Sequence, residues 1–289
     1  MSTRTRTTPL TDDLVDDAAV FPPGLASVEA AWADYLARRT TRYAVSVGPL
    51  LIATSSVAEL ADVAGRHRAD QPAVPVALIA RPGTSIDQTN RAVAQFEGLH
   101  SDSLDLCGVE VAYQDGWQRM LDLDLPVTVE VPAQAGPQQH ALAEIAGTAA
   151  RAKLRTQSTP DQGVPTPTAV ARFIATCVVS GIAFKLTGGL HRAIAHTSKP
   201  PDVIEERHGV LNVMLATARA VRREPRDVLE SSLRQRDPAT LVAAVVALPE
   251  DDVTAMRNSL TSFGCCGVLD PLRELEELGV LHLLEQETT

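Results

Sequence analysis

The sequence predicts a (β/α)8 barrel of the TIM type, an α/β fold in which eight parallel strands alternate with helices. The chain has 289 residues, the usual length for one such barrel. Short apolar segments alternate with amphipathic ones, which is typical of βα units around a parallel sheet. Only 3% of the residues are aromatic although 45% are hydrophobic, so Ala, Val and Leu must form most of the core.

Eight segments are expected to be strands, each ended by Pro, Gly or Ser residues that stop the strand or cap the next helix. In chain order they cover residues 16–21, 43–53, 74–80, 106–112, 127–131, 150–155, 182–187 and 261–265. The helices that should cover the barrel are expected at 27–39, 55–68, 85–97, 117–123, 137–145, 168–180 and 270–278.

A long helical insert is expected between strands seven and eight, over about residues 188–260. Its helices are predicted at 204–222, 227–234, 239–246 and 251–258. No repeat or linker divides the chain, so residues 13–289 should form a single domain. Residues 1–12 are polar, lack the apolar segment of a signal peptide and are expected to be a disordered tail.

Composition argues against several classes of partner. The formal net charge of -10 should repel nucleic acid and anionic membranes. No apolar stretch approaches the ~18–20 residues needed to span a bilayer. The four cysteines, at positions 107, 177, 265 and 266, form no CxxC pair, so a zinc cluster is not expected and a reducing cytoplasm fits. We expect a small-molecule substrate, no metal and no cofactor; a homo-oligomer is compatible with the sequence.

Charged residues fall on one face of four consecutive expected strands. Because strand side chains alternate between two faces, the apolar set should pack on the helices and the other set should fill the barrel. This places six polar side chains inside, near the carboxyl ends where barrel enzymes keep their sites: Glu110, Glu130, Lys153, Arg155, Lys185 and Thr187. Buried charges persist when paired, so a network is expected. An inert cluster of salt bridges is the alternative to a catalytic site.

Lysine is rare in this chain, which makes its positions informative. Lys and Arg total 26, but only Lys153, Lys185 and Lys199 are lysines. An amine can lose its proton and attack a carbonyl, whereas a guanidinium cannot. Desolvation and the nearby Lys185 cation are expected to lower the pKa of Lys153. Glu110 or Glu130 could then transfer the protons of an imine-based reaction.

Two segments carry a family resemblance. The segments AKLRT, at residues 152–156, and FKLTGGLHRA, at residues 184–193, resemble the lysine strands of deoxyribose-phosphate aldolase and related class I aldolases. The resemblance implies that Lys153 forms the Schiff base, that Lys185 is its electrostatic neighbour and that Glu110 is the acid that shuttles protons. It also implies that Gly188 and Gly189 hold a phosphate through their N–H groups.

The chain departs from the aldolase pattern at Leu154 and Arg155, which replace small residues, at His191, which replaces an arginine, and in its long insert. It also resembles a group of uncharacterised bacterial proteins with FPP, KLRT, FKxTxGLH, HGxLN and SxGxC segments. Here these segments lie at residues 21–23, 153–156, 184–191, 208–212 and 262–266.

The histidines of the insert are further candidates. His191 and His208 are expected to contact the substrate or act in acid–base catalysis, and Asn212 follows His208 by one helical turn. A metal bound by these histidines with Glu110 or Glu130 is an alternative, although the spacing is no recognised ligand motif. Three hypotheses follow: a class I aldolase-like carbon–carbon lyase, a metal- or phosphate-dependent barrel lyase or isomerase, and a non-catalytic barrel that binds a small molecule.

Overall fold

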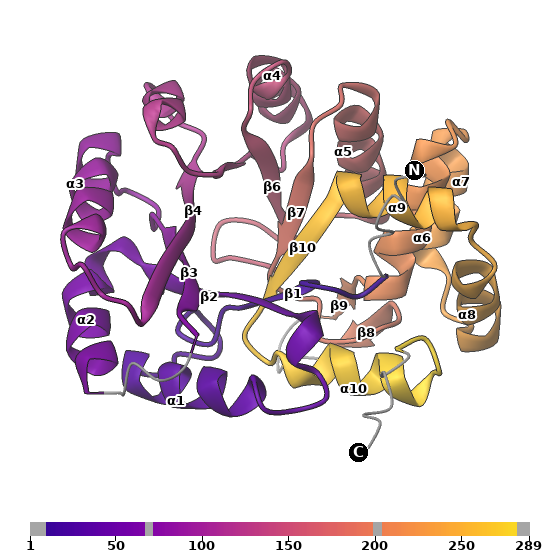
Figure 1. Cartoon of the computed structure of the whole chain (residues 1–289). Coiled ribbons are helices and arrows are strands. Elements are labelled where there is room, and N and C mark those ends of the chain that lie inside the picture. The colour runs from indigo at the N-terminus through magenta and orange to yellow at the C-terminus, as the bar shows by residue number, and fades with distance from the viewer. Residues whose placement is uncertain (1–9, 67–71, 199–203, 282–289) are drawn as a thin grey trace, which may run out of the picture.

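A closed barrel of eight parallel strands forms the centre of the protein (Figure 1). The computed structural model describes residues 10–66, 72–198 and 204–281. The strands run around the barrel in the order β1-β10-β7-β6-β5-β4-β3-β2. Their bounds are Val15–Asp17 for β1, Val47–Ala53 for β2, Val74–Ile79 for β3, Leu104–Ala112 for β4, Val127–Glu130 for β5, Arg151–Arg155 for β6, Phe184–Thr187 for β7 and Leu260–Cys265 for β10. The predicted α/β barrel is therefore confirmed.

Helices surround this barrel as the sequence predicted. They are α1 (Val28–Arg38), α2 (Val57–Gly65), α3 (Ile86–Glu97), α4 (Ala135–Ile145), α5 (Pro167–Val179) and α10 (Leu269–Glu277). Their starts follow local chemistry: the Ser27 side chain accepts from the Ala30 amide, and Ser85 forms a capping box with Gln88. The expected helix at 117–123 is instead a short 3-10 helix, η3 (Trp117–Asp122).

The first two strands are shorter than predicted. β1 ends at Asp17 because the Asp17 carboxylate accepts a hydrogen bond from the Ala19 amide and the chain turns. β2 begins only at Val47, since residues 44–46 form a 3-10 turn. Residues 10–12, expected in the disordered tail, form a turn whose Asp12 carbonyl accepts from Arg257. Residues 1–9 of that tail lie outside the described residues.

The insert between β7 and β10 holds the expected helices and one hairpin that the sequence did not reveal. The helices are α6 (Val210–Val221), α7 (Arg226–Arg234), α8 (Pro238–Val246) and α9 (Glu250–Ser259). The predicted helix at 204–222 starts six residues later than expected, at Val210, because β9 (Glu205–Arg207) pairs antiparallel with β8 (His196–Ser198). α6 is buried along most of its length and contacts α5, α7 and α9.

Strand register sets the positions of the polar side chains. On β6 and β7 the side chains of Ala152, Leu154, Phe184 and Leu186 are buried among the outer helices, and the ring of Phe184 meets Phe173 of α5 edge to face. The alternate residues point into the barrel, as predicted. Lys153 pairs in register with Lys185 on β7 and with Glu130 on β5, so neighbouring strands bring these charges to one level.

Candidate active site

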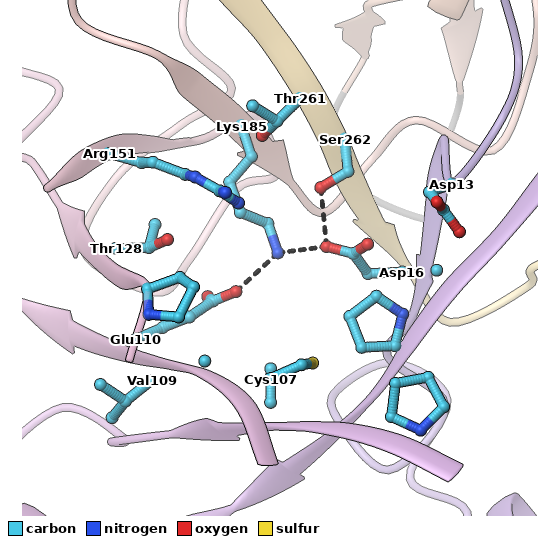
Figure 2. A pocket seen from close by; sticks show the side chains of 16 residues that line it. Asp13, Asp16, Cys107, Val109, Glu110, Thr128, Arg151, Lys185, Thr261 and Ser262 are labelled. Carbon is cyan, nitrogen blue, oxygen red and sulfur yellow. Dashed lines mark hydrogen bonds and ion pairs between the residues drawn. The ribbon is translucent and has the colours of Figure 1, made fainter. Parts of the chain in front are cut away.

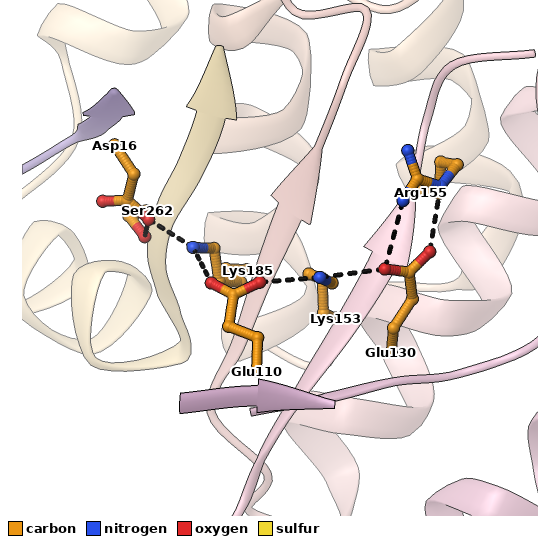
Figure 3. A network of polar contacts seen from close by, with 7 residues as sticks. All are labelled: Asp16, Glu110, Glu130, Lys153, Arg155, Lys185 and Ser262. Atoms are coloured by element: carbon orange, nitrogen blue, oxygen red, sulfur yellow. Dashed lines mark hydrogen bonds and ion pairs between the residues drawn. The ribbon is translucent and has the colours of Figure 1, made fainter. Parts of the chain in front are cut away.

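A row of ion pairs crosses the inside of the barrel (Figure 3). Oppositely charged side chains alternate along it, in the order Asp16, Lys185, Glu110, Lys153, Glu130 and Arg155. Three carboxylates therefore balance three cations. The expected network is present, and it extends to Asp16 on β1.

Glu110 is the centre of the row. Its Oε2 lies 2.6 Å from the Nζ of Lys153, and its Oε1 lies 2.6 Å from the Nζ of Lys185. The three side chains are at most 5% exposed. Charge-assisted hydrogen bonds of this length are among the strongest in proteins, and buried charges need such partners. One carboxylate thus fixes both lysines.

The two ends of the row differ in exposure. At one end Lys185 pairs with Asp16, which also accepts a hydrogen bond of 2.8 Å from the Ser262 hydroxyl. At the other end Glu130 lies 2.8 Å from the Nζ of Lys153 and takes two hydrogen bonds from Arg155, whose side chain is 35% exposed. The row therefore runs from a fully buried end to one that reaches solvent.

The charges set the protonation of the row. Burial alone would raise the pKa of Glu110, but the charges of Lys153 and Lys185 outweigh it and lower that pKa to about 2. Burial would lower the pKa of Lys153, but Glu110 and Glu130 outweigh it and raise that pKa. For Lys185, burial would likewise lower the pKa, but the charges of Asp16 and Glu110 outweigh it and raise that pKa. For Asp16, burial dominates and raises the pKa.

The expected depression of the Lys153 pKa is therefore wrong for the resting protein. The expectation paired Lys153 with Lys185, whose register it predicted correctly, but it did not place Glu110 between the two ammonium groups. A carboxylate at 2.6 Å from each Nζ acts more strongly on each lysine than the more distant like charge. At rest Lys153 is an ammonium ion.

Two cavities approach the row from opposite ends of the barrel. The front cavity, of about 510 Å³, lies at the carboxyl ends of the strands and is bordered by Glu110, Lys153 and Arg155. The rear cavity, of about 420 Å³, lies at the amino ends and is bordered by Lys185 and Glu110 (Figure 2). Glu110 borders both, so one layer of side chains separates them. The front cavity is the candidate active site, because barrel enzymes carry their chemistry at that end.

The front cavity gathers most of the residues predicted from the sequence. Lys153, Glu110, Arg155, Thr187, Gly188 and His191 line it. Glu130 reaches the same site through its ion pairs with Lys153 and Arg155. Lys185 does not border it: its ammonium lies on the rear side of Glu110. Lys185 is thus placed to hold Glu110 rather than to contact a substrate in front.

Other predicted residues lie apart from this cavity. His208 is buried, and its Nε2 lies 2.7 Å from the Pro165 carbonyl oxygen. Asn212 is fully buried and holds the insert together: its Oδ1 accepts from the Ala195 amide, and its Nδ2 donates to the carbonyls of Ser232 and Gln235. The structure gives these two residues internal partners in place of a substrate.

Gly188 and Gly189 also have structural roles in the backbone of the barrel. Gly188 and Gly189 adopt φ values of 72° and 79°, where an L side chain is strained. The Gly188 amide donates to the Gly264 carbonyl oxygen at 3.1 Å, which ties β7 to β10. That N–H group is therefore not available to a phosphate, contrary to what the resemblance implied. Gly189 does not line the front cavity.

The sequence did not decide whether Asp16, which borders the rear cavity, enters the barrel, and it gave no indication of Arg81, which lines the front cavity. Asp16 could have been found from the alternation of Val15, Asp16 and Asp17, in which only the middle residue points inward; Asp17 instead pairs with Arg38 of α1. Arg81 follows β3, lines the cavity and lies over the ring of Phe21 at 5.4 Å. Local sequence gave no signal for Arg81, because its place depends on loops that meet only in the folded chain.

The described part of the chain contains no ready metal centre. Across the described parts of the chain, no three or more His, Cys, Asp and Glu side chains group in a way that could hold a metal ion. Over the same residues, no helix is both long and apolar enough to cross a membrane. Comparisons of the chain with protein-family models, with curated proteins and with solved structures found no match. The resemblance to aldolases therefore stays a prediction, and the case for function rests on the site.

Proposed function

We propose that this protein is a class I aldolase-like lyase that makes or breaks a carbon–carbon bond of a small carbonyl compound through an imine on Lys153. One observation carries the proposal: Lys153 borders a cavity of about 510 Å³, and its Nζ lies 2.6 Å from Glu110 and 2.8 Å from Glu130. A nucleophile and two groups able to exchange its proton thus meet at the end of the barrel suited to chemistry.

The resting ammonium must first lose a proton. Both carboxylates hydrogen-bond to it, so the transfer needs no movement of the chain. Burial penalises an ion pair more than a neutral amine and a neutral acid. A substrate that displaces water from the cavity therefore favours transfer of the proton from Lys153 to Glu130, the carboxylate nearer to solvent. The free amine can then attack the carbonyl carbon.

The later steps use the same groups. Addition of the amine gives a carbinolamine, whose hydroxyl leaves as water after taking the proton from Glu130. In the resulting iminium ion, Glu130 takes the proton of the substrate hydroxyl, the carbon–carbon bond breaks, the first carbonyl product leaves, and the nitrogen accepts the electron pair to give an enamine. Glu130 returns this proton to the enamine carbon, and water then hydrolyses the imine, which releases the second product and restores the Lys153 ammonium ion. Lys185 holds Glu110 in place throughout.

A second candidate follows from the raised pKa of Lys153. If Lys153 remains an ammonium ion, it can stabilise the oxyanion of an enolate while Glu130 removes a proton from the neighbouring carbon. The protein would then be a barrel isomerase or lyase that uses the same charges without an imine.

The proposed setting is the cytoplasm. All four cysteines are free thiols, which supports a reducing compartment. The proposed partner is a small carbonyl compound, with Arg155 and Arg81 at the cavity to receive an anionic group.

Reductive trapping distinguishes the two candidates. The protein is incubated with a panel of small aldehydes, ketones and 2-oxo acids, then treated with sodium cyanoborohydride, and the adduct is mapped by peptide mass. We expect an adduct on Lys153 that is absent in Lys153→Arg, which keeps the cation but cannot form the imine. Lys185→Arg is the matched control and should keep the adduct. An adduct on Lys185 would exchange the two roles; no adduct in folded protein would reject the imine and favour proton transfer by the ammonium form.

A further inference from the structure

Two adjacent cysteines meet one histidine at the wall of the front cavity. β10 ends at Cys265, and Cys266 follows it. The Sγ of Cys265 lies 3.6 Å from Nδ1 of His191, and the Sγ of Cys266 lies 3.6 Å from Nε2 of the same ring. Cys266 and His191 both line the cavity, whereas Cys265 is 1% exposed. Of the two thiols, only Cys266 is thus open to a ligand in the cavity.

A carboxylate completes this group. Asp270, in the first turn of α10, has its Oδ2 3.4 Å from Nδ1 of His191. Gly267 makes the approach possible, because a Cβ atom there would lie 2.2 Å from the Asp270 Oδ2 and 3.2 Å from the His191 Nδ1. A thiol, an imidazole and a carboxylate in this order are the parts of an activated cysteine nucleophile.

The two sulfur atoms favour the protonated form of His191. Hydrogen bonds with the sulfur atoms of Cys265 and Cys266 raise the pKa of His191 to about 11, although burial opposes them. Burial raises the pKa of Cys265, whose thiol also donates to the Gly267 carbonyl oxygen. The charged groups that line the same cavity are three cations and two carboxylates, Arg81, Lys153, Arg155, Glu110 and Asp161.

We propose that Cys266 and His191 form a nucleophilic pair at the front cavity, and that this pair adds reversibly to aldehydes which enter it. The thiolate sulfur forms a bond to the carbonyl carbon, the carbon–oxygen π bond breaks, and the oxygen takes the proton of the His191 imidazolium. The product is a hemithioacetal, and no oxidant or other reactant is needed. This inference does not depend on an imine at Lys153, because it uses a different nucleophile, which directly follows a different strand.

The rate of alkylation by iodoacetamide measures the reactivity of Cys266 directly. The reagent forms a sulfur–carbon bond with loss of iodide, and peptide fragmentation separates Cys266 from Cys265. An ordinary thiol with a pKa near 8.5 is about 0.3% thiolate at pH 6, so its alkylation falls more than 100-fold from pH 8.5 to pH 6. We expect the rate at Cys266 to fall less than about tenfold, because the proposed pair places Nε2 of His191 3.6 Å from the sulfur, where it can take the thiol proton. A fall of 100-fold or more in the wild-type protein would overturn the pair.

Variants assign the effect to the histidine. His191→Asn should slow alkylation of Cys266 at pH 6 by at least about tenfold. His196→Asn is the matched control, because His196 lies on β8 and does not line the cavity. Equal rates in wild type and a folded His191→Asn would contradict the proposal. Cys107 and Cys177 serve as internal references, because burial raises their pKa values, that of Cys107 to about 12, and they should label slowly.

Glycolaldehyde tests whether an aldehyde adds to Cys266. It should slow alkylation of Cys266 in the wild type, and equally in Lys153→Arg, where no imine can form at that position. Protection that disappears in Lys153→Arg would show that aldehyde bound at Lys153 shields the thiol, and would reject the hemithioacetal. Protection that remains while trapping at Lys153 fails would support the thiol and reject the imine, so the two proposals fail independently.

Discussion

Replacing Glu110 by Gln removes one charge from the middle of the buried row and leaves its shape unchanged. The wild-type row balances three carboxylates against three cations; the variant leaves two carboxylates, Asp16 and Glu130, against the same three cations. In addition, one carboxylate oxygen becomes an NH2 group that faces a lysine ammonium, and neither of these groups can accept a hydrogen bond. Both changes destabilise the folded state.

The size of the effect follows from the position of Glu110. Its pKa falls from 4.5 to about 2 in the folded protein. At 1.36 kcal/mol per pKa unit, this corresponds to about 3 kcal/mol of stability at neutral pH. Removal of one partner from a buried ion pair costs about 3–5 kcal/mol by a separate argument. We therefore expect Glu110→Gln to lower the free energy of unfolding by about 3–5 kcal/mol at pH 7.

The pH dependence has a definite sign. Because the folded pKa of Glu110 lies below the unfolded value, its carboxylate stabilises the protein above about pH 4.5, and this contribution is lost as the pH falls toward 2. The difference in stability between wild type and Glu110→Gln should be full at pH 7 and shrink below pH 4.5.

Urea unfolding followed by tryptophan fluorescence checks this, since Trp32 and Trp117 are buried and should report unfolding. The matched control is Glu97→Gln, an exposed carboxylate at the end of α3, which should change stability by less than about 0.5 kcal/mol. The double variant Glu110→Gln, Lys153→Gln leaves two complete ion pairs and should be more stable than Glu110→Gln alone. A loss below about 1 kcal/mol for Glu110→Gln at pH 7, or a difference that grows in acid, would refute the reasoning.

Two further predictions concern residues with internal roles. Asn212→Leu leaves the buried Ala195 amide without its acceptor and removes a donor from the carbonyls of Ser232 and Gln235, so it should cost about 2 kcal/mol or more in urea unfolding. The reactivity of Cys266 toward iodoacetamide should stay unchanged in the folded variant; an effect on that reactivity alone would show a direct role in the site. Gly188→Ala puts a side chain on a residue whose φ is 72°, and the new Cβ would lie 2.8 Å from the Cβ of Gln157. We therefore expect a thermal unfolding midpoint several degrees lower than in the wild type, and an unchanged midpoint would contradict this assignment of strain.

The fold and much of the site could be predicted because they depend on local patterns. Alternation on β6 and β7 placed Lys153 and Lys185 on the inner face, and the parallel register then made them neighbours. Side-chain period and strand direction suffice for such a prediction. The β8–β9 hairpin was missed because its two strands have three residues each, too few for a periodic signal.

What the sequence determined by itself is the barrel, the insert and the inward face of β4 to β7, because these follow from the spacing of apolar residues. What only the tertiary structure decided is which charges touch. Glu110 lies between the two lysines, and this contact raises the pKa of Lys153 where the sequence predicted a lowered one. His191 and Cys266 are 75 residues apart in the chain and meet only when the barrel closes. Electrostatic effects depend on distances in space, and these are fixed only when strands distant in the chain lie side by side.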